Sequence, residues 1–343
     1  MKACVFIDRE KMEVREVPKP DLPPKGLILK VMACGICGSD FRNFHNGLKG
    51  GIKNQIIGHE IAGIIEATDD PRFPVGSAVA LAPDISCGQC WYCKHGLVNL
   101  CENHKMLGTH YPGGYAQYMA IPSEVLTHGF VELIPPGVDF QCAALAETAA
   151  AVVACQNRLH IGPGDTVAII GDGPVGFLHV EVAHAHGASA ILLGHRRLSL
   201  AKHFSPELLL DNTDPEEAVQ AVLKATEGRG ADVVILAVPS AAPQNQALKM
   251  VRKRGTIVIY GGVPATSESP SLDSNKIHYD EITITGSFSY PSTGLWDALQ
   301  FIAKKKIHAD QYITQVVSLD QVPDIMTEPR NKNTIKIMID PWK

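Results

Sequence analysis

The sequence predicts an α/β protein of two domains, one rich in β-strands and one built on a doubly wound parallel sheet. Three observations predict it. The chain has 343 residues, whereas a single hydrophobic core stops growing at about 250–300 residues. Short strand patterns fill residues 1–145, and between residues 146 and 284 apolar strands alternate with helices. Such alternation indicates βαβ units that form a parallel sheet.

The first domain is expected to be a barrel-like β domain, because its strand patterns are short and closely spaced. The segments LILKVMAC (27–34), EIAGIIEAT (60–68) and SAVALAP (77–83) have strand character. Turn signals rich in Pro and Gly, PPKG (23–26) and DDPRFPVG (69–76), separate them.

The second domain begins near an Ala-rich helix, AALAETAAAVVACQNRLH (143–160). Fully apolar strands indicate a sheet that is covered on both faces. After about residue 280 a strand, a helix and a final strand follow, and we expect 285–343 to complete the first domain. The predicted strands are 166–171, 190–195, 231–238 and 256–262, and the predicted helices between them are 174–187, 215–228 and 243–255.

Composition and charge exclude some classes of function. The formal net charge of −5 provides no basic field for nucleic acid. No stretch approaches the ~18 uncharged apolar residues of a membrane span. The N-terminal MKACVFIDREKMEV has the pattern of a first strand and not of a signal peptide. We therefore expect a cytoplasmic protein that acts on a small molecule.

Four of the nine cysteines lie in one short segment, CGQCWYCKHGLVNLC. Four thiolates at this spacing favour a closed tetrahedral zinc site, which leaves no position for a substrate. A zinc ribbon for nucleic acid is the alternative, but Lys94 is the segment's one Lys or Arg. The predicted structural zinc ligands are Cys87, Cys90, Cys93 and Cys101.

A glycine-rich loop follows the strand TVAIIG and precedes a helix. In that position GxGxxG predicts a Rossmann-type dinucleotide site, because glycines allow the pyrophosphate to approach the helix N-terminus. The expected contacts are Gly171, Gly173, Pro174, Val175 and Gly176.

The end of the second strand of this domain predicts which dinucleotide binds. NAD-binding units usually place an acidic residue there for the ribose 2′-hydroxyl. This chain instead has Gly194, His195, Arg196 and Arg197. Guanidinium groups suit a 2′-phosphate, which they bind bidentately. We expect NADP(H) in preference to NAD(H); a solvated basic turn is the alternative.

Five motifs occur in a diagnostic order: GICGSD (35–40), GHEIAG (58–63), the cysteine segment, GGYAQYMAIP (113–122) and GDGPVG (171–176). Over the whole chain the sequence resembles the zinc-containing medium-chain dehydrogenase/reductase family, most closely its sorbitol and polyol dehydrogenase branch. The resemblance implies a GroES-like catalytic domain, a Rossmann cofactor domain, a second, catalytic zinc, and a homodimer or homotetramer.

The same resemblance implies roles for individual residues. The catalytic zinc ligands fall on Cys37, His59 and Glu147, a chemically sensible set with one open position. Glu60 matches a residue that can approach the metal, and Asp40 matches an acceptor that orients the metal-bound imidazole. The Pro that usually follows the Glu ligand is absent, so an acid on a solvated helix face is the alternative for Glu147.

The resemblance also implies a zinc-dependent hydride transfer between NADP(H) and a secondary alcohol or ketone, with Ser39 taking the alcohol proton. The usual relay His is replaced by Arg42, and His45 is the candidate substitute; an exposed loop His is the alternative. Backbone contacts to ribose and nicotinamide fall on Gly262, Val263, Ser287 and Phe288, for which ordinary turns are the alternative.

The sequence leaves the substrate open. Polyols, sugar alcohols and cyclic polyols are expected, and sugar-alcohol phosphates or aminocyclitol and inosose derivatives are alternatives. Lys49 and Lys53 could hold a phosphate, but two surface lysines are weak support. A non-catalytic relative that keeps only the structural zinc is an alternative of a different class.

Overall fold

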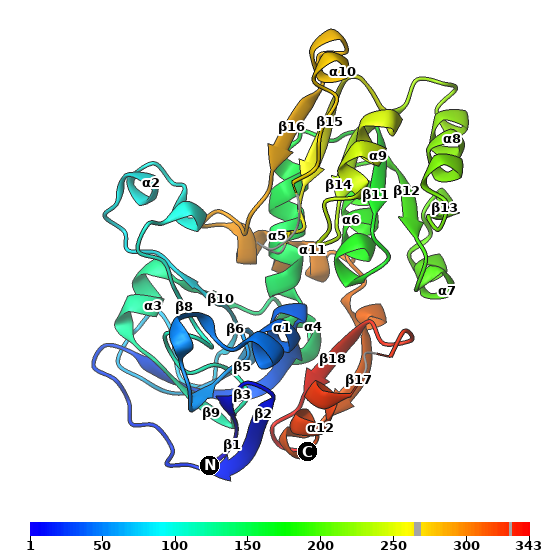
Figure 1. The fold of residues 1–343 in the computed structure, drawn as a ribbon. Helices are drawn as coiled ribbons and strands as arrows, with labels where there is room; N and C mark the ends of the chain where they lie inside the picture. Colours follow the sequence, from blue (N-terminus) through cyan, green and yellow to red (C-terminus); the bar gives the residue numbers. More distant parts are fainter. Residues whose placement is uncertain (264–268, 329–330) are drawn as a thin grey trace. The chain divides into compact units, whose positions relative to one another are not determined.

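The computed structural model describes residues 1–263, 269–328 and 331–343. The chain forms two compact units, and the second is inserted into the sequence of the first (Figure 1). Unit 1 comprises Met1–Ala151 and Tyr290–Lys343, and unit 2 comprises Val152–Ser289. Unit 1 extends slightly beyond the expected residue 145, because the helix α5 (Ala146–Arg158) begins in it.

The main sheet of unit 1 is built around β3, which pairs with β5, β9 and β18. The C-terminal strand β18 pairs antiparallel with β3, so the end of the chain lies in this unit. Strand β17, parallel to β18, was not foreseen. The sheet consists of β10 (Phe130–Leu133), β6 (Ala78–Ala82), β5 (Glu60–Thr68), β3 (Leu27–Ile36), β18 (Lys336–Ile339) and β17 (Ile313–Val317) in that order, with β9 (Tyr118–Ile121) on β3.

Two smaller sheets and several short helices complete unit 1. The small sheets are β2 (Lys11–Glu16), β1 (Lys2–Asp8) and β4 (Gln55–Ile56), and the pair β7 (Asp84–Ile85) and β8 (Lys105–Met106). Its core packs buried apolar side chains of β3, β5 and β6 with aromatic rings such as Phe6, Phe44 and Tyr115. Its other helices are α1 (Gly38–Asn46), α2 (Trp91–Lys94), α3 (Ser123–His128), α4 (Phe140–Ala144), α11 (Gly294–Ala303) and α12 (Val322–Thr327).

Unit 2 contains a six-stranded parallel sheet in the order β13-β12-β11-β14-β15-β16. Numbered from β11, this is the 3-2-1-4-5-6 order of a doubly wound dinucleotide-binding sheet, as predicted. Its strands are β11 (Thr166–Ile170), β12 (Ser189–Gly194), β13 (Leu208–Asp211), β14 (Ala231–Leu236), β15 (Val251–Ile259) and β16 (Thr283–Gly286), and its helices are α6 (Pro174–Ala185), α7 (Leu198–Ala201), α8 (Pro215–Ala225), α9 (Pro243–Met250) and α10 (Ser274–Tyr279).

One local expectation for unit 2 was wrong, and one strand was not predicted. Residues 251–255 were expected to extend a helix, but α9 ends at Met250 and Val251 is already extended and paired with Ala231 of β14. Strand β13 (LLLD) was not predicted. Among the described residues no helix is both long and apolar enough to cross a membrane.

Candidate metal and cofactor sites

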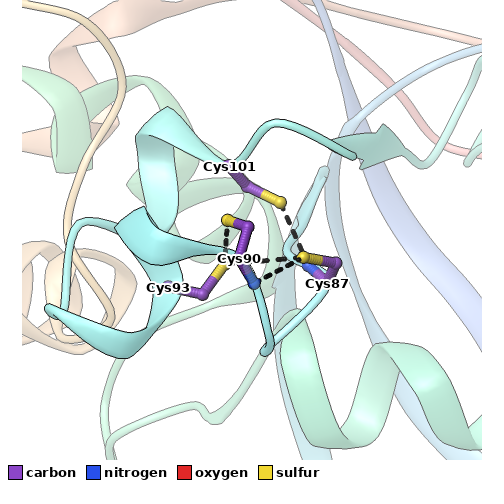
Figure 2. A group of neighbouring side chains, drawn as sticks. All are labelled: Cys87, Cys90, Cys93 and Cys101. Carbon is purple, nitrogen blue, oxygen red and sulfur yellow. Dashed lines mark hydrogen bonds between the residues drawn. The ribbon is translucent and has the colours of Figure 1, made fainter.

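The four cysteines predicted to bind a structural zinc converge in the structure (Figure 2). Their sulfur atoms all lie within 4.8 Å of one another. Cys90 precedes the short helix α2, which carries Cys93, and a following turn returns the chain to Cys101. The segment thus folds back on itself and presents all four thiols to one point.

The spacing of these thiols fits a zinc ion. The Sγ atoms of Cys90 and Cys93 are 3.4 Å apart, and those of Cys87 and Cys93 are 4.0 Å apart. A tetrahedron with Zn–S distances of about 2.3 Å places sulfur atoms about 3.8 Å apart. Backbone N–H groups lower the pKa of Cys87 to about 6, whereas burial raises that of Cys101 to about 12. Part of the cluster is therefore ready to bind a cation as thiolate.

A second group of ligands, Cys37, His59 and Glu60, forms in unit 1, with ligand atoms within 4.8 Å of one another. Cys37 caps the N-terminus of α1, directly after β3. Glu60 begins β5 and is paired with Gly35 of β3. The antiparallel register therefore brings together residues that are more than twenty positions apart in the chain.

His59 is held in one orientation by neighbours on both sides of its ring. The Nδ1 atom lies 3.4 Å from the Oδ1 atom of Asp40, and Nε2 lies 3.4 Å from the Ser39 hydroxyl. Asp40 is buried and also accepts hydrogen bonds from the Cys37 N–H (2.8 Å) and the Tyr115 hydroxyl (2.9 Å). Burial acts to raise the pKa of Asp40, but His59 and these donors outweigh it and lower that pKa. The carboxylate thus stays charged and holds Nδ1, which leaves Nε2 for a metal.

Glu60 is fully buried, and its carboxylate is bound by two side chains whose role was not predicted from the sequence. The Lys336 ammonium forms an ion pair with its Oε1 atom, and the Thr148 hydroxyl donates to the same oxygen at 2.9 Å. A Cβ at Gly35 would lie 1.9 Å from the Oε2 atom of Glu60. The signal for Lys336 was its charge within the otherwise apolar final strand.

Glu147 lies on the first turn of α5, outside the group of Cys37, His59 and Glu60. It accepts a hydrogen bond from the buried Tyr290 hydroxyl at 3.3 Å. Burial raises its pKa to about 7, with the nearby His59 acting in the opposite direction and Glu60 adding to the rise. Its carboxylate therefore interacts electrostatically with both residues.

His45, the candidate relay residue, lies apart from this group. It occupies the last turn of α1, with half of its side chain exposed, and its Nδ1 atom is 3.4 Å from Oε1 of Glu10. The structure does not bring its ring into hydrogen-bond contact with Ser39. The exposed Lys53, considered for a phosphate, forms an ion pair with Asp8.

The glycine-rich loop of unit 2 connects β11 to α6 and leaves space open at the N-terminus of that helix. Gly171 has a φ of +133°, in the region that favours glycine. A Cβ on Gly176 would lie 1.8 Å from the Gly171 carbonyl oxygen, so this glycine allows the loop to pack on the helix. At Gly173, which caps α6, a Cβ would meet nothing within 4 Å, so space is open in front of the helix N-terminus. Pro174 and Val175 form its first turn.

The residues that follow β12 lie at the same edge of the sheet as this loop. His195 and Arg196 are exposed, and Arg197 is partly buried. The Nε atom of Arg197 is buried without a hydrogen-bond partner among the described residues. The other predicted contacts follow the next strands: Gly262 and Val263 come after β15, and Ser287 and Phe288 after β16, with 65% of Phe288 exposed.

Comparison with known proteins shows that both units resemble domains of zinc-type alcohol dehydrogenases. Residues 23–136 match the alcohol dehydrogenase GroES-like domain, and residues 174–304 match the zinc-binding dehydrogenase domain. The chain is 34% identical to a sorbitol dehydrogenase of Bacillus subtilis, over 99% of this chain and 97% of that protein. It is 30% identical to a D-arabitol-phosphate dehydrogenase of Enterococcus avium, over 96% and 94% of the two chains. A putative zinc-binding dehydrogenase from Sinorhizobium meliloti, solved with NADP bound, superposes with a TM-score of 0.90 at 30% identity, covering 99% of both chains.

Proposed function

Because the chain belongs to the zinc-containing medium-chain dehydrogenase/reductase family and is a zinc-dependent alcohol dehydrogenase of its polyol branch, we propose that it transfers hydride between NADP(H) and a secondary alcohol or its ketone. The proposed substrate is a polyol, sugar alcohol or cyclic polyol. The convergence of Cys37, His59 and acidic groups beside the Ser39 hydroxyl carries this proposal.

For the catalytic zinc we propose the ligands Cys37, His59 and Glu147, with Glu60 able to approach in place of Glu147. A thiolate, an imidazole and a carboxylate are an ordinary donor set for an open zinc site. The grouping of Cys37, His59 and Glu60 supports the proposal. Zinc held there supplies Lewis-acid chemistry, which makes an alcohol hydroxyl easier to deprotonate and polarises a ketone.

The chain's own residues then position groups and move the proton. Asp40 holds the Nδ1 side of His59, so the ring keeps one orientation. Ser39 accepts the alcohol proton, because its hydroxyl lies beside His59 Nε2. We propose His45 as the group that passes the proton to solvent. Its ring contacts Glu10 and makes no hydrogen bond to Ser39, so the proposed relay runs from Ser39 to His45 through water. An unaltered pH–rate profile in His45→Ala would remove it from the relay.

The dinucleotide is proposed to be NADP(H). The open space at Gly173 leaves room for a pyrophosphate at the N-terminus of α6. The absence of an acidic side chain at the end of β12, together with the unpartnered Nε of Arg197, supports a bound 2′-phosphate. The proposed contacts are those already described after β11, β12, β15 and β16. A homodimer or homotetramer is proposed from the family alone.

The test is nicotinamide absorbance during turnover of a substrate panel. The panel contains sugar alcohols, cyclic polyols, polyol phosphates and simple alcohols, each offered with NADP⁺ or NAD⁺ and with a chelator-treated sample beside it. Chelator-sensitive oxidation of a polyol with NADP⁺ is the expected result. If the fully zinc-loaded enzyme turns over no polyol, the polyol assignment is wrong. About one zinc per chain in place of two would favour a non-catalytic protein.

A further inference from the structure

One carboxylate of the glycine-rich loop is bound to the loop that follows β12. Asp172 is the second residue of GDGPVG and is 7% exposed. Its Oδ2 atom accepts three backbone N–H hydrogen bonds, from His195 at 2.9 Å and from Arg196 and Arg197 at 2.5 Å each. Three donors on one buried carboxylate oxygen make a strong, charge-assisted link between two loops that are more than twenty residues apart.

Gly194, the last residue of β12, has no side chain and so leaves room for this carboxylate. A Cβ on Gly194 would lie 2.3 Å from the Cβ of Asp172 and 2.5 Å from its Cγ. Any larger residue would therefore displace Asp172. The place where NAD-binding units carry an acidic side chain is thus kept small, so that a carboxylate from another loop can bind the backbone there.

The bonded segment carries the groups that could recognise a 2′-phosphate. The three N–H donors belong to the residues whose side chains are one imidazole and two guanidiniums. The backbone of this segment is fixed, while Arg197 Nε has no partner among the described residues. Asp211 on the adjacent β13 also interacts with His195, but its Oδ1 atom accepts hydrogen bonds from Thr213.

We propose that Asp172 is a positioning residue for cofactor selectivity: by fixing the backbone of residues 195–197, it preorganises Arg196 and Arg197 for the 2′-phosphate of NADP(H). The inference rests on the proposed NADP(H) preference. Preorganisation strengthens binding because less side-chain and loop ordering is needed when the ligand arrives. NADH lacks the 2′-phosphate and gains nothing from these two arginines.

The experiment measures dissociation constants of NADPH and NADH by calorimetry on the purified zinc-loaded enzyme. In Asp172→Ala, NADPH affinity should fall about tenfold and NADH affinity less than about twofold, since only NADPH needs the ordered arginines. Asp172→Asn keeps an acceptor oxygen and should retain most of the selectivity. Asp211→Asn, which removes a neighbouring carboxylate that does not bind the loop backbone, should leave the ratio unchanged.

The outcomes separate this inference from the proposed cofactor. If the wild type prefers NADPH and Asp172→Ala keeps that preference, or if both affinities fall equally, Asp172 has no positioning role. If the wild type does not prefer NADPH, the proposed cofactor is wrong and this inference falls with it. Should Asp172→Ala fail to fold, Gly194→Ala provides the same test, because its methyl group displaces Asp172. It too should reduce selectivity.

Discussion

The ammonium of Lys336 on the C-terminal strand is paired with the carboxylate of Glu60, which is 276 positions earlier in the chain. Lys336 is 5% exposed and Glu60 is 0% exposed. Burial acts to lower the pKa of Lys336, but Glu60 and Cys37 outweigh it and raise that pKa, so the lysine is charged at neutral pH. The last strand of unit 1 thereby neutralises an acid directly beside the proposed metal ligands.

Removing one partner of this pair should destabilise the protein strongly. Lys336→Met leaves Glu60 buried without its cation, which costs about 3–5 kcal/mol of unfolding free energy in comparable buried pairs. Urea unfolding measures the change. Glu60→Gln combined with Lys336→Met should recover much of it. Lys2→Met, which breaks the exposed pair with Asp320, is the matched control and should change little. Equal effects of the two lysine variants would contradict the assignment.

Glu147→Ala should remove one zinc ion per chain and leave the other. The carboxylate is proposed to complete the catalytic ligand set, and three protein ligands are needed to keep zinc in an open site. Metal analysis after dialysis measures the loss. Glu60→Gln is the comparison, since Glu60 is the carboxylate grouped with Cys37 and His59. If Glu60→Gln loses the zinc and Glu147→Ala retains it, the resting ligand is Glu60.

Cys93→Ser should remove the zinc predicted at the four-cysteine cluster and spare the zinc proposed at Cys37, His59 and Glu147. Its sulfur lies 3.4 Å from that of Cys90 and 4.0 Å from that of Cys87, so one substitution breaks the four-thiolate set. Because structural zinc contributes directly to folding, thermal unfolding should begin at a lower temperature. Cys142→Ser alters a buried thiol outside this cluster and should keep full zinc content. Full zinc content in Cys93→Ser would exclude the structural site.

His179 should make unit 2 less stable at acidic pH. It is fully buried on α6, against Gln156 and the ring of Tyr260, and burial lowers its pKa from 6.5 to about 3. In the unfolded chain His179 is therefore protonated below pH 6.5, whereas in the folded chain it stays neutral down to about pH 3. The contribution of neutral His179 to the free energy of unfolding is therefore complete above pH 6.5. Below that pH it falls by at most about 1.4 kcal/mol per pH unit.

Urea midpoints of the wild type and His179→Leu, recorded between pH 7 and pH 4, test this expectation. The variant should lose less stability over that range, because it no longer contains the group that titrates. His203→Gln changes an exposed histidine and should follow the wild type. Parallel pH curves for wild type and His179→Leu would show that the ring does not remain neutral in the fold.

The sequence by itself determined the features that depend on local spacing. The CxxCxxC segment, the glycines between a strand and a helix, and the alternation of apolar strands with helices predicted the four-cysteine cluster, the loop between β11 and α6, and the parallel sheet. The first two patterns are each contained in one short segment, and the third repeats a local unit of one strand and one helix. Strand β13 was missed, although the final strand β18, which is equally short, was predicted.

Only the tertiary structure decided which distant groups share a site. Pairing of β18 with β3 brings Lys336 to Glu60, and the ends of β11 and β12 bring Asp172 to the backbone of residues 195–197. Neither partner could be chosen from the sequence. A charged residue in an apolar strand, or an acidic residue in a glycine-rich loop, indicates that the side chain is buried or binds something, but the sequence does not identify its partner. Buried charges need partners, and strand register determines which ones they obtain.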